Sequence, residues 1–189
     1  MRSCALITGS AKRIGKEIAL TLAKNGYDIA LHYNNSKDSA IKTQNEIEKL
    51  GVNCKLFKCD LSNTKQSSKL IETVVKELAN LDTLINSASI FERASLLDSS
   101  NNLIDNTFNI NLVSPLILMR DFAKNVKKGN ILNILDGKIS NNNYSHFVYS
   151  LTKKGLLDLT YLSANEFAPN IRVNGIAPGL ILPPDGDDY

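Results

Sequence analysis

Cysteine is scarce in this sequence, and its spacing matches no metal site. The chain has three cysteines, Cys4, Cys54 and Cys59, which is an odd number without a Cys-x-x-Cys pair. Cys4 and Cys54 fall within strand-like runs, where a cysteine usually serves as a small buried hydrophobic residue. We therefore expect no metal ligation and a reducing, cytoplasmic setting.

Long apolar runs and a strong net charge are also lacking. No stretch approaches the ~18 apolar residues of a membrane helix, and the run 4–7 is far too short for the apolar part of a signal peptide. The formal net charge of +3 is small and scattered, so neither a membrane nor a nucleic acid is an expected partner. Without linkers or repeats, residues 1–189 are predicted to form a single domain.

What the sequence does contain is a regular alternation of short apolar runs and amphipathic stretches. The expected strands are 3–8, 28–33, 53–58, 81–86, 130–135 and 171–176. The expected helices are about 14–25, 37–50, 64–79, 102–127 and 148–167. This order predicts right-handed βαβ units and an α/β fold, with a parallel sheet covered by helices on both faces.

The segment Thr8-Gly9-Ser10-Ala11-Lys12-Arg13-Ile14-Gly15 joins the first expected strand to the first helix. Gly9 permits a tight turn, and the helix beyond it offers free N–H groups and a positive dipole end to a pyrophosphate. Two glycines alone would equally fit a turn and a helix cap. Their position in the first βα turn of an alternating chain favours a dinucleotide-binding loop.

The end of the second strand indicates which dinucleotide is bound. An acidic residue usually meets the ribose hydroxyls of NAD there, and the run Leu31-His32-Tyr33-Asn34-Asn35-Ser36 has none. Arg13 and Ser36 would instead bind a 2′-phosphate, which favours NADPH. His32 is either part of this site or a buried strand histidine. Asp60, after the third strand, either accepts from the adenine amino group or caps the next helix, and both roles are compatible.

Tyr149 and Lys153 are the main catalytic candidates. They lie four residues apart on an expected helix and are therefore neighbours. A cation at this position lowers the pKa of a phenol, which would make Tyr149 a general acid at neutral pH. The alternative is a surface pair. Pro115 adds support, because it cannot donate to the carbonyl of Asn111, and that free carbonyl can hold an ordered water.

Together these residues resemble the short-chain dehydrogenase/reductase family over essentially the whole chain. The matching pieces are Thr8-Gly9 to Gly15, Asn86-Ser87-Ala88-Ser89, Asn111, Tyr149 with Lys153, and Arg172-Val173-Asn174 leading to Pro178-Gly179. The resemblance implies a Rossmann-type, doubly wound parallel sheet of strand order 3-2-1-4-5-6. It also implies a tetrad of Asn, Ser, Tyr and Lys, of which Asn111, Tyr149 and Lys153 match.

Two departures point to the pteridine reductase branch of that family, which includes dihydromonapterin reductases. Arg13 stands in place of the usual loop glycine, and Asp136 in place of the catalytic serine. In that branch an aromatic residue at the Phe91 position stacks the pterin, the Ser89 hydroxyl contacts the same ligands, and the Arg13 position reaches phosphate and pterin. A pterin presents a C=N bond whose nitrogen needs a proton, and a carboxyl at Asp136 beside Tyr149 suits that transfer.

The residue patterns and the resemblance together predict the following site. Catalytic residues are Tyr149, Lys153, Asp136 and Asn111. Cofactor contacts come from Gly9, Lys12, Arg13, Ile14, Gly15, His32, Tyr33, Asn34, Ser36, Asp60, Leu61, Asn86, Ala88, Tyr149, Lys153, Pro178 and Gly179. Substrate contacts come from Arg13, Ser89, Phe91, Asp136, Tyr149 and Leu180. The expected activity is NADPH-dependent reduction of a dihydropteridine of the dihydromonapterin, dihydrobiopterin or dihydrofolate type.

Two other readings stay open: a carbonyl-reducing member of the family, such as a 3-oxoacyl reductase, and a non-catalytic NADPH-binding remnant. Family members continue beyond Pro178-Gly179 through a further helix and a last strand. We expect this chain to be truncated relative to them, with loop-like residues 183–189 and an exposed sheet edge. The surplus apolar residues of 102–127 and 148–167 resemble the family's helix-bundle contact and predict a homodimer or homotetramer.

Overall fold

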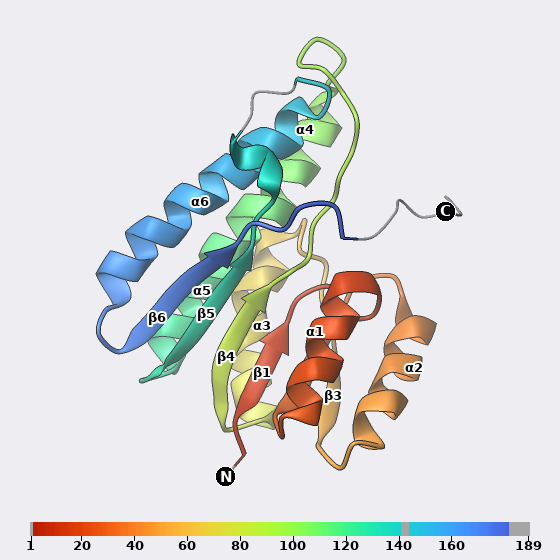
Figure 1. Ribbon diagram of the computed structural model, residues 1–189, viewed down its shortest axis with the longest axis vertical. Helices are drawn as coiled ribbons and strands as arrows, with labels where there is room; N and C mark the ends of the chain where they lie inside the picture. Colours follow the sequence, from red (N-terminus) through yellow and green to blue (C-terminus); the bar gives the residue numbers. More distant parts are fainter. Residues whose placement is uncertain (1, 141–143, 182–189) are drawn as a thin grey trace.

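Six strands form one parallel sheet in the order β3-β2-β1-β4-β5-β6, as predicted (Figure 1). The computed structural model describes residues 2–140 and 144–181, so the predicted loop at 183–189 lies outside the described residues. The strands are β1 (Cys4–Ile7), β2 (Asp28–Tyr33), β3 (Cys54–Lys58), β4 (Leu81–Asn86), β5 (Gly129–Ile134) and β6 (Ile171–Ile176). Every residue of β1 and β2 is buried, as expected for central parallel strands.

Six α-helices accompany the sheet in the described residues. They are α1 (Arg13–Lys24), α2 (Lys37–Glu48), α3 (Thr64–Glu77), α4 (Asn101–Phe108), α5 (Ser114–Asn125) and α6 (Phe147–Phe167), with a short 3-10 helix at Gly137–Ser140. None of the helices in these ranges has both the length and the apolar character needed to cross a membrane.

The single helix expected over 102–127 is divided into three parts. A π-helical turn, η1 (Asn109–Val113), separates α4 from α5. Pro115 is the physical reason, because its ring nitrogen has no hydrogen to donate to the carbonyl four residues earlier, that of Asn111. The widened turn includes Asn111 and places this residue in the interior with no exposed surface.

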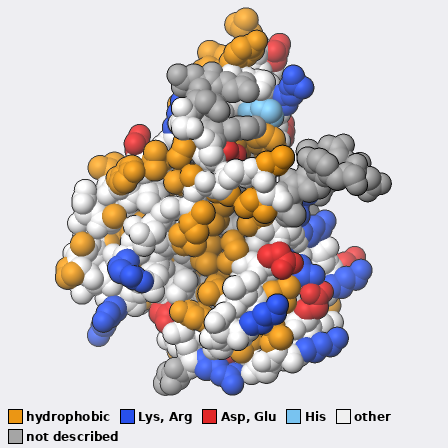
Figure 2. All heavy atoms as spheres, in the orientation of Figure 1, with side chains coloured by type: hydrophobic (Ala, Val, Ile, Leu, Met, Phe, Trp, Pro, Cys, Tyr) orange, Lys and Arg blue, Asp and Glu red, His pale blue; other side chains and the backbone are white. Residues whose placement is uncertain are grey.

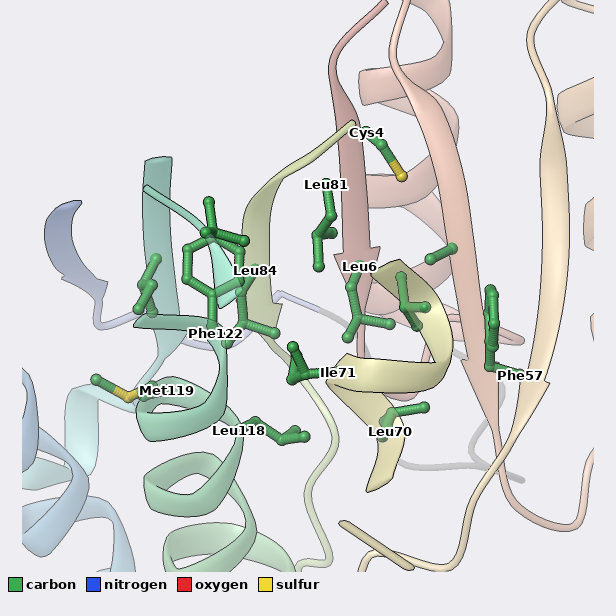
Figure 3. Packing of buried hydrophobic residues seen from close by; sticks show 14 of the residues in the cluster. Cys4, Leu6, Phe57, Leu70, Ile71, Leu81, Leu84, Leu118, Met119 and Phe122 are labelled. Carbon is green, nitrogen blue, oxygen red and sulfur yellow. The ribbon is translucent and has the colours of Figure 1, made fainter. Parts of the chain in front are cut away.

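The core is divided between the two faces of the sheet. One cluster packs α3 and α5 against the sheet through large side chains that include Phe122, Leu118 and Ile71 (Figure 3). The other packs α1 and α2 through smaller residues such as Ala19 and Ala23. Short alanine side chains let α1 lie close to β1 and β2, which fixes the loop between β1 and α1 at the edge of the sheet.

In the described residues, helices flank both faces of the sheet as expected, but they cover the β5–β6 half less completely on one face. On the face opposite α6, Leu132 and Ile134 are only partly buried and Ile176 is 52% exposed. Hydrophobic side chains gather there beside α1 (Figure 2). Within residues 2–140 and 144–181, α1 and α2 pack mainly on the β1, β2 and β3 part of the sheet.

The carboxyl ends of the strands meet at one edge of the sheet. Because the strand order reverses between β1 and β4, the loops that follow these two strands part there and leave a crevice. The segments 8–12, 87–91, 135–140 and 177–181 surround it, and these contain part of the predicted site.

Candidate active site

The loop between β1 and α1 is held by close backbone contacts that only glycine permits. Gly9 has φ +68°, and a Cβ there would come within 2.9 Å of the Cα of Ala88. A Cβ at Gly15 would come within 2.4 Å of the carbonyl oxygen of Gly9. The Thr8 hydroxyl accepts hydrogen bonds from the N–H groups of Ser87 (2.9 Å) and Ala88 (3.0 Å). The loops after β1 and β4 therefore form one rigid unit.

Arg13 adopts a left-handed backbone conformation at the first position of α1. Its φ is +52°, and within the described residues it is the only residue other than glycine with a positive φ. Such a conformation costs a non-glycine residue on the order of 1–3 kcal/mol. The side chains of Lys12 and Arg13 are exposed beside the N-terminus of α1, so two cations accompany the positive end of the helix dipole.

Two cavities of about 450 and 460 Å³ adjoin at this edge of the sheet. They share a wall that consists of Arg13, Ile14, Ser87, Ser89, Phe91 and Tyr149. The first contains all the predicted substrate contacts and Lys153, together with the segments 134–137 and 178–181. The second is lined by Gly9, Lys12, Arg13, Ile14, Gly15, His32, Asn34, Leu61, Ala88 and residues of the shared wall. No acidic residue lines it within the described part of the chain.

Four residues predicted to contact the cofactor do not line either cavity: Tyr33, Ser36, Asp60 and Asn86. Asp60 accepts hydrogen bonds from the N–H and hydroxyl of Ser62, and from Asn34 at 3.4 Å. It does not cap α3, because Asn63 takes that role. Asn86 is buried and donates to Asn133 at 2.8 Å, which joins β4 to β5.

Tyr149 and Asp136 form the central polar contact of the first cavity. The Tyr149 hydroxyl donates to Oδ2 of Asp136 at 2.5 Å, which brings together two residues 13 positions apart in the chain. Burial raises the pKa of Tyr149 strongly, and the hydrogen bond to Asp136 and its charge raise the pKa further. The net shift of this pKa is therefore upward, opposite to the one expected from Lys153, and burial is its largest cause. The phenol is held as a protonated donor.

Lys153 lies under the same tyrosine. It is 4% exposed, and its ammonium donates to the carbonyl oxygen of Ile134 at 2.8 Å and lies 5.7 Å from the centroid of the Tyr149 ring. Burial lowers the pKa of Lys153 to about 8, and the nearby Asp136 opposes this shift. Lys153 therefore places a cation next to the Tyr149–Asp136 pair without bonding to the phenol.

Asn111 is fully engaged in holding the wall of the site. Its amide donates to the carbonyl of Ile90 (3.0 Å) and to the Thr152 hydroxyl (3.3 Å), and its oxygen accepts from the N–H of Ile90 (2.9 Å). The segment that carries Phe91 is thereby tied to α6. Any part of Asn111 in catalysis would have to come through its main-chain carbonyl.

Phe91 belongs to a cluster of three aromatic rings that the sequence patterns did not reveal. Its ring lies parallel to His146 with centroids 4.1 Å apart, and edge-on to Tyr149 at 4.6 Å. Phe91 and Tyr149 line both cavities, whereas His146 lines neither. His146 directly precedes α6, one helical turn before Tyr149, and this spacing is the only signal that could have identified it.

The loop after β6 forms another wall of the first cavity. The N–H of Gly137 donates to the carbonyl of Pro178 at 2.8 Å, so this loop is fixed beside Asp136. Leu180 is 84% exposed at the mouth of the cavity. Ser87 lines both cavities, although the sequence patterns assign it no role.

The fold and this constellation define an oxidoreductase of the Rossmann type. Residues 3–186 match the sequence model of the short chain dehydrogenase family. The chain belongs to this family. A 3-oxoacyl-[acyl-carrier-protein] reductase, FabG, of Staphylococcus epidermidis is 31% identical, with 96% of this chain and 76% of the relative covered. A tropinone reductase-like protein of Erythroxylum coca is 33% identical, with 98% and 72% covered.

Solved structures also resemble this chain. FolM alternative dihydrofolate reductase 1 from Brucella suis, in complex with NADP, superimposes with a TM-score of 0.91 at 34% identity and covers 96% of this chain and 76% of its own. The Brucella canis protein, also complexed with NADP, gives 0.91 and 34%, with 97% and 75% covered. These neighbours are consistent with the pteridine reductase branch.

Proposed function

We propose that this protein is an NADPH-dependent reductase that reduces the C=N bond of a dihydropteridine or dihydrofolate to the tetrahydro form. The observation that carries the proposal is the hydrogen bond from Tyr149 to Asp136, in a cavity whose wall includes Phe91. A carboxyl at this place suits a substrate whose ring nitrogen must receive a proton. The FolM structures, named as dihydrofolate reductases, support the same substrate class.

The second cavity fits NADPH. Its walls offer Lys12, Arg13 and the N-terminus of α1 to phosphates, and no carboxylate lines it in the described residues. Asn34 stands where an acidic residue would bind the ribose hydroxyls of NAD. When bound, NADPH supplies the hydride. The donor set therefore favours a cofactor with a 2′-phosphate, for which Arg13 is the main candidate contact.

The residues of the first cavity would deliver the proton. The Tyr149 hydroxyl is protonated and already donates to Asp136, so the two groups share one proton at 2.5 Å. As the substrate nitrogen becomes basic, either oxygen can transfer this proton, directly or through water. The cation of Lys153 stabilises the negative charge that remains on the pair. Phe91 would support the flat pteridine ring by stacking.

A 3-oxoacyl reductase is the second candidate, because curated relatives at 31% identity have that name. A growing alkoxide is stabilised by hydroxyl donors, and this chain has a carboxyl, Asp136, where the family's catalytic serine would supply one. The residue at this single position therefore favours the C=N substrate.

An assay of NADPH oxidation separates the two candidates. Dihydropterin, dihydrofolate and a short 3-oxoacyl thioester are supplied side by side, with the Tyr149→Phe variant as the inactive control and Tyr27→Phe as a matched control outside the site. We expect turnover of a dihydropteridine or dihydrofolate that Tyr149→Phe loses and Tyr27→Phe keeps. Efficient reduction of the thioester, with none of the pterins, would transfer the assignment to the second candidate.

We also propose that the protein self-associates through α5 and α6. Of the apolar residues on these helices, Leu116 is 46%, Tyr161 64% and Leu162 69% exposed, which leaves an apolar surface that a second copy would cover. A cytoplasmic location is proposed as well, because Cys4, Cys54 and Cys59 are buried free thiols that suit a reducing compartment.

A further inference from the structure

His32 occupies an unusual position in the middle of the nucleotide-binding edge. It lies on β2, is 2% exposed, and its ring reaches the backbone on either side of its own strand. Nδ1 accepts a hydrogen bond from the N–H of Gly9 at 3.0 Å, and Nε2 lies 3.0 Å from the carbonyl oxygen of Cys59. The ring therefore joins the loop after β1 to the end of β3.

These two contacts fix the state of the imidazole. The N–H of Gly9 can only donate, so Nδ1 must carry a lone pair, and the single proton of the neutral ring is on Nε2. There it points at the Cys59 carbonyl, which can only accept. Both ring nitrogens are thus committed to the backbone, and neither is available to a ligand, although His32 lines the second cavity.

The main chain of His32 holds the same loop. Its carbonyl accepts from the N–H of Ser10 at 3.0 Å, so one residue binds two consecutive N–H groups of the segment before α1. The Thr43 hydroxyl, on α2, donates to the carbonyl of Ala11, the next residue of the loop, at 3.1 Å. The loop is therefore fastened from the protein side at Gly9, Ser10 and Ala11, just before the N-terminus of α1.

We infer that His32 is a positioning residue for cofactor binding: it does not contact the dinucleotide but holds Gly9 in the conformation in which the phosphate loop is ready to bind. The inference rests on the proposed NADPH site. Gly9 is left-handed and lies against Ala88, so its N–H points inward and needs a buried acceptor. Without one, part of the population would leave this conformation, and the apparent Kd rises in inverse proportion to the fraction that keeps it.

Two matched substitutions separate this role from a general contribution to stability. In His32→Asn the amide oxygen takes the place of Nδ1, so Gly9 keeps its acceptor and Cys59 loses its donor. In His32→Gln the longer side chain places its amide nitrogen near the position of Nε2, so Cys59 keeps its donor and Gly9 loses its acceptor. Each variant loses one buried hydrogen bond, and we expect similar decreases in Tm.

The readouts are the Kd for NADPH, from a fluorescence titration, and the exchange rate of the Gly9 amide without nucleotide. We expect His32→Gln to weaken NADPH binding roughly tenfold or more and to accelerate Gly9 exchange, with His32→Asn within about threefold of the unaltered protein in both. Equal effects of the two variants would overturn the inference. Failure of the unaltered protein to bind NADPH would instead reject the proposed function, while Gly9 exchange still decides the role of His32.

Discussion

If Tyr149 and Asp136 act as one proton-donating unit, their substitutions must have non-additive effects on turnover. Tyr149→Phe keeps the ring against Phe91 and removes the only proton that the pair holds, so turnover should decrease by ~10²–10⁴. Asp136→Asn keeps the shape and an acceptor but removes the charge. A hydrogen bond to an ionised partner contributes ~1.5–3 kcal/mol and a neutral one ~0.5–1.5. The difference, about 1–1.5 kcal/mol, corresponds to a decrease of roughly five- to tenfold.

The double variant decides between a unit and two independent groups. Once the phenol is gone, the carboxylate has no proton to share, so the double variant should match Tyr149→Phe within about threefold. Independent groups would multiply their losses and reach roughly 10³–10⁵. Single-turnover rates with saturating NADPH and a dihydropteridine measure the chemical step, and Asp158→Asn, at an exposed position of α6, is the control. Multiplicative losses would refute the shared-proton mechanism.

The pH profile gives a second test of the same pair. The carboxylate of Asp136 raises the pKa of Tyr149, so removing its charge must lower that pKa. The rate requires a protonated phenol, and its alkaline decline should therefore move to lower pH in Asp136→Asn. An unchanged alkaline limb would show that Asp136 does not influence the group that donates the proton.

Other predictions concern the remaining parts of the site and fold. Arg13→Ala should weaken NADPH binding about tenfold or more, from ~1.5–3 kcal/mol for a charge-assisted contact, while NADH binding and the control Lys24→Ala stay nearly unchanged in titrations. Arg13→Gly should bind NADPH as weakly as Arg13→Ala, yet have the higher Tm of the two because glycine removes the strain at φ +52°. Phe91→Ala should raise the KM for dihydropterin with little change in the Kd for NADPH, and Leu97→Ala, on the same loop, should change neither. Burial lowers the pKa of His32 to about 4 from 6.5, so its contribution to stability is complete above pH 6.5 and is lost as the pH falls toward 4, by at most ~3 kcal/mol. The difference in Tm between the unaltered protein and His32→Gln should therefore shrink as the pH falls over that range. A difference in Tm that stays constant would contradict a lowered pKa for His32. Leu162→Glu on α6 should shift sedimentation toward monomer with the NADPH site intact, whereas a parent protein that is already monomeric would rule out the proposed contact.

The alternation of apolar runs and amphipathic stretches was sufficient to predict the fold. All six strands lie within two residues of their predicted bounds, and the sheet order that the family resemblance implied is confirmed. These patterns can be recognised in a sequence because a buried parallel strand must be apolar on both faces, whereas a helix that covers the sheet must be apolar on one face. The helix interruption at Asn109–Val113 also has a local cause, because Pro115 lacks a hydrogen-bond donor whatever the tertiary structure.

The chemistry of the site depended on contacts between distant segments. The sequence showed Tyr149 and Lys153 one helical turn apart, and from this spacing alone the cation should govern the phenol. The structure buries the phenol, places Asp136 on its hydroxyl and turns the ammonium toward the Ile134 carbonyl, and the pKa of Tyr149 is raised, first by burial and then by Asp136. A pKa depends on burial and on every charge in reach, and neither can be read from spacing along one helix.

For His32 too, the sequence showed the position and the tertiary structure decided the role. Its place at the end of the second strand was visible in the sequence, and both a cofactor contact and a buried strand residue were compatible with it. Only the packing of β1, β2 and β3 side by side brings the Gly9 N–H and the Cys59 carbonyl to the two sides of one ring. The sequence by itself determined the elements and their order, because each follows from local periodicity. Which polar groups meet at the ends of those elements was decided by the tertiary structure, because hydrogen bonds act over about 3 Å between residues far apart in the chain.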